Sequence, residues 1–105
     1  MINKFISYRQ LDYMDCGPTC LRMIARYYGR YYSLEDIRQK AFTSKEGTAL
    51  INLSQAAERL GFRTQAVATD LETLSNDVSL PCIAHWRNRH YIVIYRITAQ
   101  YVYVA

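Results

Sequence analysis

Cys16 is the residue of this sequence best suited to nucleophilic chemistry. It lies in the string Asp15-Cys16-Gly17-Pro18, at the predicted start of a helix. Unpaired N–H groups and the positive end of the helix dipole favour a reactive thiolate at such a position. Gly17 would let a substrate approach the backbone closely. Most cysteines are buried structural residues. The local context alone does not decide whether Cys16 is a nucleophile or such a structural residue, and the two interpretations are evenly balanced.

The other two cysteines favour a structural interpretation. Cys20 lies on the apolar stripe of the predicted helix, and Cys82 lies inside a predicted strand. An odd number of cysteines does not make a disulfide framework in a short chain. The spacing of Cys16 and Cys20 is not that of a zinc knuckle, and no second pair follows it. We therefore expect no metal site.

Two histidines could act as the base for Cys16. His90 follows a short polar loop at the start of a predicted strand, where its ring could take a proton from a thiol. His85, on the preceding strand, is its rival, and the pattern alone does not choose between them. Gln10 lies six residues before Cys16, and its amide could donate to the oxyanion formed at an attacked carbonyl. Taken alone, Gln10 would be interpreted as a polar surface residue.

The elements that position these residues follow from hydrophobic periodicity. Apolar residues at helical spacing predict a helix over residues 17–28, a second helix follows through Ala41, and a third runs through Leu60. The residues expected to cap or end these helices are Pro18, Gly29, Ser33, Thr48 and Gly61. Strands are predicted over residues 62–69, 81–86, 90–97 and 101–105, with a short helical turn over 70–74. Helices followed by sequential strands predict an α+β domain with an antiparallel sheet.

Composition limits the class of protein. The chain has 105 residues, half of them hydrophobic and 21% charged, which is typical of one folded domain. The net charge of +4 is spread along the chain, so we expect no nucleic-acid partner. No stretch approaches the ~18 apolar residues of a membrane span, and no secretory signal is present. We expect this piece to be soluble and cytosolic.

Several motifs in order carry a family resemblance. Residues 10–21 read QLDYMDCGPTCL, and further matching stretches are residues 33–38, residues 47–48 with 56–62, residues 80–86 and residues 90–95. Together they resemble the double-glycine leader peptidases, family 39 of the papain-like clan of cysteine peptidases. These domains lie at the N-termini of bacterial ABC transporters that process and export bacteriocins. The similarity covers nearly the whole chain.

The resemblance implies a fold and a set of site residues. It implies a papain-like α+β fold in which N-terminal helices pack on a C-terminal antiparallel sheet. It makes Cys16 the nucleophile, His90 the general base and acid, and Gln10 the oxyanion donor, with Gly17 and Tyr91 expected to contact substrate. The family's third catalytic residue is an Asp after the strand that follows the histidine. No Asp or Glu follows His90 here, so we expect a single peptidase domain, residues 1–105, cut just before that Asp.

The implied function is cleavage of a leader peptide after a Gly-Gly pair, coupled to export. The expected partners are the leader of a precursor peptide and the transmembrane and ATP-binding domains of the same transporter, at the cytoplasmic face of the bacterial inner membrane. No cofactor is expected in this domain, because ATP would bind only the separate nucleotide-binding domain. The alternative hypotheses are a leader-binding docking domain with little turnover and an adaptor domain with incidental cysteines.

Overall fold

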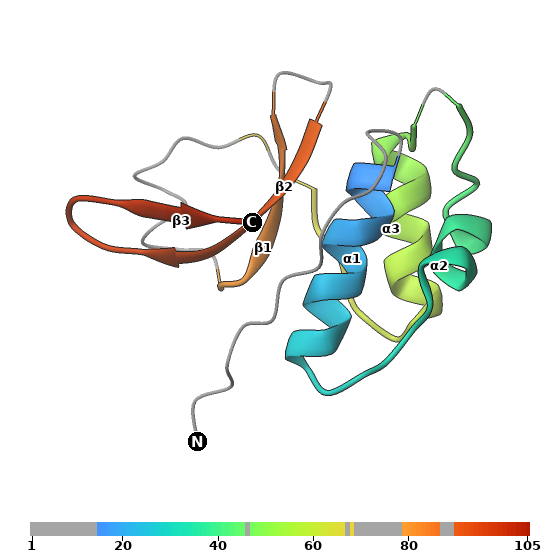
Figure 1. The fold of residues 1–105 in the computed structure, drawn as a ribbon, viewed down its shortest axis with the longest axis horizontal. Helices are drawn as coiled ribbons and strands as arrows, with labels where there is room; N and C mark the ends of the chain where they lie inside the picture. Colours follow the sequence, from blue (N-terminus) through green and yellow to red (C-terminus); the bar gives the residue numbers. More distant parts are fainter. Residues whose placement is uncertain (1–14, 46, 67, 69–78, 87–89) are drawn as a thin grey trace.

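Helices and sheet form two adjoining parts of the molecule. The computed structural model describes residues 15–45, 47–66, 68, 79–86 and 90–105. In this part of the chain, helices α1 (Cys16–Tyr27), α2 (Leu34–Lys40) and α3 (Leu50–Arg59) precede strands β1 (Cys82–Trp86), β2 (His90–Ile97) and β3 (Val102–Val104). Figure 1 shows α1 between the sheet and the other two helices. The predicted α+β class with an antiparallel sheet is confirmed.

The sheet is antiparallel, with β2 in the middle of the order β1-β2-β3. β1 and β2 pair in a register that places His85 opposite Tyr91 and Trp86 opposite His90. The pairing of β2 with β3 shifts between Ile94 and Arg96. Short connections between sequential strands produce this arrangement, because a tight turn can join only antiparallel neighbours.

The core lies where α1 meets β2. Leu21 on α1, Val93 on β2 and Ile37 on α2 are each at most 2% exposed. Burying such a side chain stabilises the fold by about 1.5–3 kcal/mol. The apolar stripe of α1 therefore fixes the position of its first turn relative to the start of β2. Within the described residues, no helix is long and apolar enough to span a membrane.

Most of the predicted helix ends are confirmed. The Ser33 hydroxyl accepts a hydrogen bond from the backbone N–H of Asp36 at 3.1 Å, as an N-cap should. Gly29 and Gly61 follow α1 and α3 with φ of 82° and 96°, in the left-handed region that ends helices. The cap predicted for the third helix is wrong. Ala49, not Thr48, occupies the N-cap position of α3, and its side chain makes no capping hydrogen bond. The Thr48 hydroxyl pairs instead with that of Thr43 at 2.7 Å.

The strand predicted over residues 62–69 is also wrong. Residues 62–66 and 68 are not in a strand. The segment returns along α3 instead: the Thr64 hydroxyl donates to the Glu58 carboxylate at 2.9 Å and pairs with the Ser54 hydroxyl at 2.5 Å. Alternating polarity favours a strand only where another strand is available to pair with it. The helical turn predicted over residues 70–74 lies outside the described residues.

Candidate active site

Cys16 is the first residue of α1, as its sequence context predicts. The first N–H groups of a helix have no partners within the helix, and they carry the positive end of its dipole. The Cys16 side chain is 5% exposed and lies against the start of β2. Its sulfur accepts a hydrogen bond from the backbone N–H of Tyr91, with an N–S distance of 3.4 Å. This hydrogen bond joins the first turn of α1 to the start of β2.

Both histidines lie beside Tyr91. His90 is its chain neighbour, so the Tyr91–Cys16 hydrogen bond places the backbone of His90 one residue from the contact with the sulfur. His90 is exposed. His85 is the cross-strand partner of Tyr91, and the two rings stack at 4.3 Å between centroids with 10° between their planes. The fold thus joins Cys16 to the strand that begins with His90, and His85 lies on the neighbouring strand.

Tyr91 is held on several sides. It is 4% exposed, and its hydroxyl donates to the carbonyl oxygen of Thr48 at 2.8 Å. A Cβ added at Gly17 would lie 3.2 Å from the Tyr91 ring and 3.5 Å from Thr48 Cβ. Burial, with smaller contributions from Cys16 and Cys20, raises the pKa of Tyr91, so the hydroxyl remains a donor. Gly17 is therefore required for the close packing of the ring against α1.

The remaining cysteines are poor nucleophiles. Cys20 is 2% exposed, and burial followed by the nearby Cys16 raises its pKa to about 12. Burial also raises the pKa of Cys82. Both side chains therefore stay in the thiol form at neutral pH, and the thiol is not the reactive species.

A match to a family model decides the classification. The model of the Peptidase C39 family matches residues 4–105. This chain belongs to the Peptidase C39 family. The family consists of cysteine peptidases, which agrees with the resemblance found in the sequence.

The C39 chain is similar to parts of much longer proteins. It is 39% identical over 94 residues to the pediocin PA-1 transport/processing ATP-binding protein PedD of Pediococcus acidilactici, which covers 85% of the chain and 13% of the relative. It is 40% identical over 77 residues to the transport/processing ATP-binding protein ComA of Streptococcus pneumoniae, covering 72% of the chain and 11% of the relative. The chain therefore spans about an eighth of the length of these relatives.

Solved structures have the same fold as this C39 chain. A double glycine motif protease from an AMS/PCAT transporter, crystallised with the leader peptide, superposes with a TM-score of 0.91 at 27% identity, covering 97% of this chain and 73% of that one. The peptidase domain of Streptococcus ComA, a bi-functional ABC transporter of a quorum-sensing pathway, superposes with a TM-score of 0.86 at 31% identity, covering 97% and 78%. The papain-like peptidase fold implied by the resemblance is confirmed.

Some predicted site residues of the C39 chain lie outside the described part. Gln10 is one of them, as is the loop of residues 87–89 before His90. Within the described residues, no group of three His, Cys, Asp or Glu side chains could hold a metal ion.

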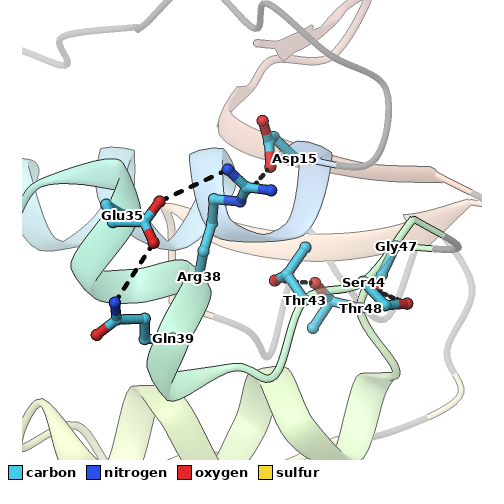
Figure 2. A network of polar contacts seen from close by, with 8 residues as sticks. All are labelled: Asp15, Glu35, Arg38, Gln39, Thr43, Ser44, Gly47 and Thr48. Atoms are coloured by element: carbon cyan, nitrogen blue, oxygen red, sulfur yellow. Dashed lines mark hydrogen bonds and ion pairs between the residues drawn. The ribbon is translucent and has the colours of Figure 1, made fainter.

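The structure adds residues near Cys16 that the sequence analysis missed. Thr48 contacts Tyr91 through its backbone, and Asp15 forms an ion pair with Arg38 at 3.0 Å. Figure 2 shows this pair beside the first turn of α1. Arg38 is the last residue of the family motif at residues 33–38. Its place in that motif was the signal in the sequence that could have identified it.

Proposed function

We propose that this chain is a cysteine endopeptidase that cleaves the leader of a secreted peptide after a Gly-Gly pair, as the peptidase domain of a bacterial ABC exporter. The observation that carries the proposal is the hydrogen bond from Tyr91 to the Cys16 sulfur, because it joins a helix N-terminus to the strand that begins with His90. Relatives named for both processing and transport support it, as does the solved double glycine motif protease with a leader peptide.

The chemistry begins with the Cys16 thiolate, formed as His90 takes the thiol proton. The sulfur attacks the carbonyl carbon of the second glycine, and the oxygen becomes an oxyanion that the Cys16 N–H and the Gln10 amide stabilise. The tetrahedral intermediate collapses, the C–N bond breaks, and His90 gives its proton to the leaving amine. Water then attacks the thioester as His90 takes its proton. The C–S bond breaks, which frees the Cys16 thiolate, and the leader leaves with a new carboxylate.

Selection of glycine fits the crowding around Cys16. Gly17, Tyr91 and Thr48 pack so closely that a single added carbon at residue 17 would contact both neighbours. A substrate cleft walled by such packing would select glycine by exclusion, since any Cβ on the substrate would clash. We assign Gly17 and Tyr91 to the shaping of this site, Gly17 through its backbone and Tyr91 as the packed ring beneath it.

A leader-binding docking domain is the second candidate function. It would apply to residues 1–105 on their own, because no Asp or Glu follows His90 within them to orient the imidazole. The resemblance places that acid in a segment following β3. In both candidate functions the partners are a double-glycine leader and the transmembrane and ATP-binding domains of one transporter, at the cytoplasmic face of the inner membrane. Neither function needs a cofactor in this domain or a nucleic acid.

The test is cleavage of a synthetic double-glycine leader peptide followed by mass spectrometry. The wild-type chain should cut after the second glycine, Cys16→Ala should bind the leader without cutting it, and Cys82→Ala should cut normally as the matched control. Leader binding without cleavage by the wild-type chain would favour the docking domain. Cleavage by Cys16→Ala would show that another residue is the nucleophile.

A further inference from the structure

Asp15 directly precedes Cys16 and occupies the N-cap position of α1. Its side chain is 8% exposed and makes no capping hydrogen bond, with backbone angles φ −93° and ψ 7°. An Asp at this position ordinarily accepts a hydrogen bond from an N–H of the first turn. This carboxylate is therefore buried beside Cys16 without serving as the cap of the helix.

Arg38 on α2 supplies the positive charge that faces this carboxylate. Its Nε lies 3.0 Å from Asp15 Oδ1, a contact with ion-pair distance but without hydrogen-bond geometry. Arg38 also lies 3.6 Å from Glu35, and Figure 2 shows the guanidinium between the two carboxylates. The Glu35 side chain is 67% exposed, so water and salt screen its charge. The buried charge of Asp15 is screened far less, and Arg38 acts mainly on it.

We propose that Arg38 is a positioning residue that cancels the charge of Asp15 and so allows Cys16 to ionise. Asp15 and Cys16 are consecutive residues, so a carboxylate on one and a thiolate on the other would be neighbouring like charges. The second of two such charges forms with difficulty unless a cation neutralises the first. This inference rests on the proposed role of Cys16 as the nucleophile.

Other titratable groups lie on α1 and on the elements packed against it. They are Cys20, Arg22, Arg26 and Tyr27 on α1; Glu35, Asp36 and Lys40 on α2; Glu58 and Arg59 on α3; Cys82 and His85 on β1; and His90, Tyr91, Tyr95 and Arg96 on β2. Cys20 and Tyr91 have raised pKa values and stay neutral, and Asp36 is paired with Lys40 at 2.6 Å. The histidines are the same in every variant below, so their effects cancel in the comparison.

The experiment measures the rate of Cys16 alkylation by iodoacetamide against pH, mapped by mass spectrometry, together with the ultraviolet absorbance of the thiolate. Arg38→Gln should move the Cys16 titration to higher pH by about half a unit or more, because Asp15 is left uncompensated. Asp15→Asn should move it to lower pH, and the double variant should return close to wild type. Arg38→Lys, which keeps the charge, should stay close to wild type.

Arg38→Gln and Asp15→Asn should shift the Cys16 titration in opposite directions. Loss of a merely structural contact would change both variants in the same way. Lys40→Gln is the matched control, since it removes from α2 a positive charge that is paired with Asp36 rather than Asp15, and it should leave the titration unchanged. The proposal is overturned if Asp15→Asn shows no shift or an upward shift, or if Lys40→Gln shifts as much as Arg38→Gln. The downward shift of Asp15→Asn decides the matter even if Arg38→Gln does not fold. Alkylation needs no leader peptide, so failure here is distinct from a failure to cleave leaders.

Discussion

The backbone N–H of Tyr91 donates to the sulfur of Cys16 over 3.4 Å and 75 residues of sequence. This bond joins the first residue of α1 to the second residue of β2. The Tyr91 hydroxyl extends the connection to Thr48, in the loop before α3. Three segments that are distant in sequence therefore meet at one tyrosine, and displacing its ring should disturb all of them.

Cys16 should be alkylated before the other cysteines at neutral pH. It lies at a helix N-terminus, whereas burial raises the pKa of Cys20 to about 12 and raises that of Cys82. Brief treatment with iodoacetamide and mass-spectrometric mapping measures the order of labelling. Equal labelling of the three, or preference for Cys82, would refute the assignment of Cys16 as the nucleophile.

Replacing His90 should abolish most of the activity, while replacing His85 should not. His90→Ala removes the proposed base and should lower kcat/KM by about 10²–10⁴-fold. His85→Ala is the matched control: it removes the ring stacked on Tyr91 and should cost about 0.5–1.5 kcal/mol of stability. Steady-state kinetics on a double-glycine leader and urea unfolding separate the two effects. A larger kinetic loss in His85→Ala would reverse the assignment of the two histidines.

Gly17→Ala should impair catalysis more than folding. The new methyl would lie 3.2 Å from the Tyr91 ring and push it away from α1. Overpacking costs about 1–3 kcal/mol, while alanine favours a helix over glycine by about 1 kcal/mol, so the net loss of stability should be small. A displacement near 1 Å at the site can lower the rate by about 10²-fold. Unchanged kcat/KM would mean that the ring yields without moving the Tyr91 backbone.

Stability should fall in alkaline solution because of Cys20. Its folded-state pKa is raised to about 12 from an ordinary 9.0, so the folded state holds a proton that the unfolded state releases. The stabilisation is complete below about pH 9 and is lost as the pH rises toward about 12. Urea unfolding at about pH 8 and about pH 11 should show a loss on the order of a few kcal/mol, smaller in Cys20→Ala. An equal loss in that variant would assign the pH dependence to other groups, such as Tyr91.

An acid supplied after β3 should increase turnover. Without a carboxylate, the His90 ring can still accept the Cys16 proton, but its tautomer and orientation are less fixed. A version extended by native residues that include the expected Asp should have a higher kcat/KM than residues 1–105, and changing that Asp to Ala should remove the gain. Loss of the acid costs about 10⁴-fold in a serine peptidase, and a more acidic thiol should lose less. If extension changes nothing and residues 1–105 are already fast, another residue orients His90.

Local features of the structure were predictable wherever the deciding contacts lie within one turn or one strand. The start of α1 at Cys16, the Ser33 cap and the strand that begins at His90 all follow from neighbours a few residues apart. The strand predicted over residues 62–69 failed because a strand depends on a partner, and this segment bonds to α3 instead. The histidine assignment came from the family motif, since periodicity treats His85 and His90 alike.

By itself, then, the sequence determined which family the chain belongs to and predicted which residues carry the chemistry, because motif order and local periodicity are properties of the chain alone. Only the tertiary structure decided what lies around Cys16. The packing of α1 on β2 brings Tyr91 to the sulfur, and the packing of α2 on α1 brings Arg38 to Asp15. Asp15 occupies the N-cap position of α1 but makes no capping hydrogen bond. The structure pairs it with a guanidinium instead, because a buried carboxylate is costly without a countercharge, and that cation comes from another helix.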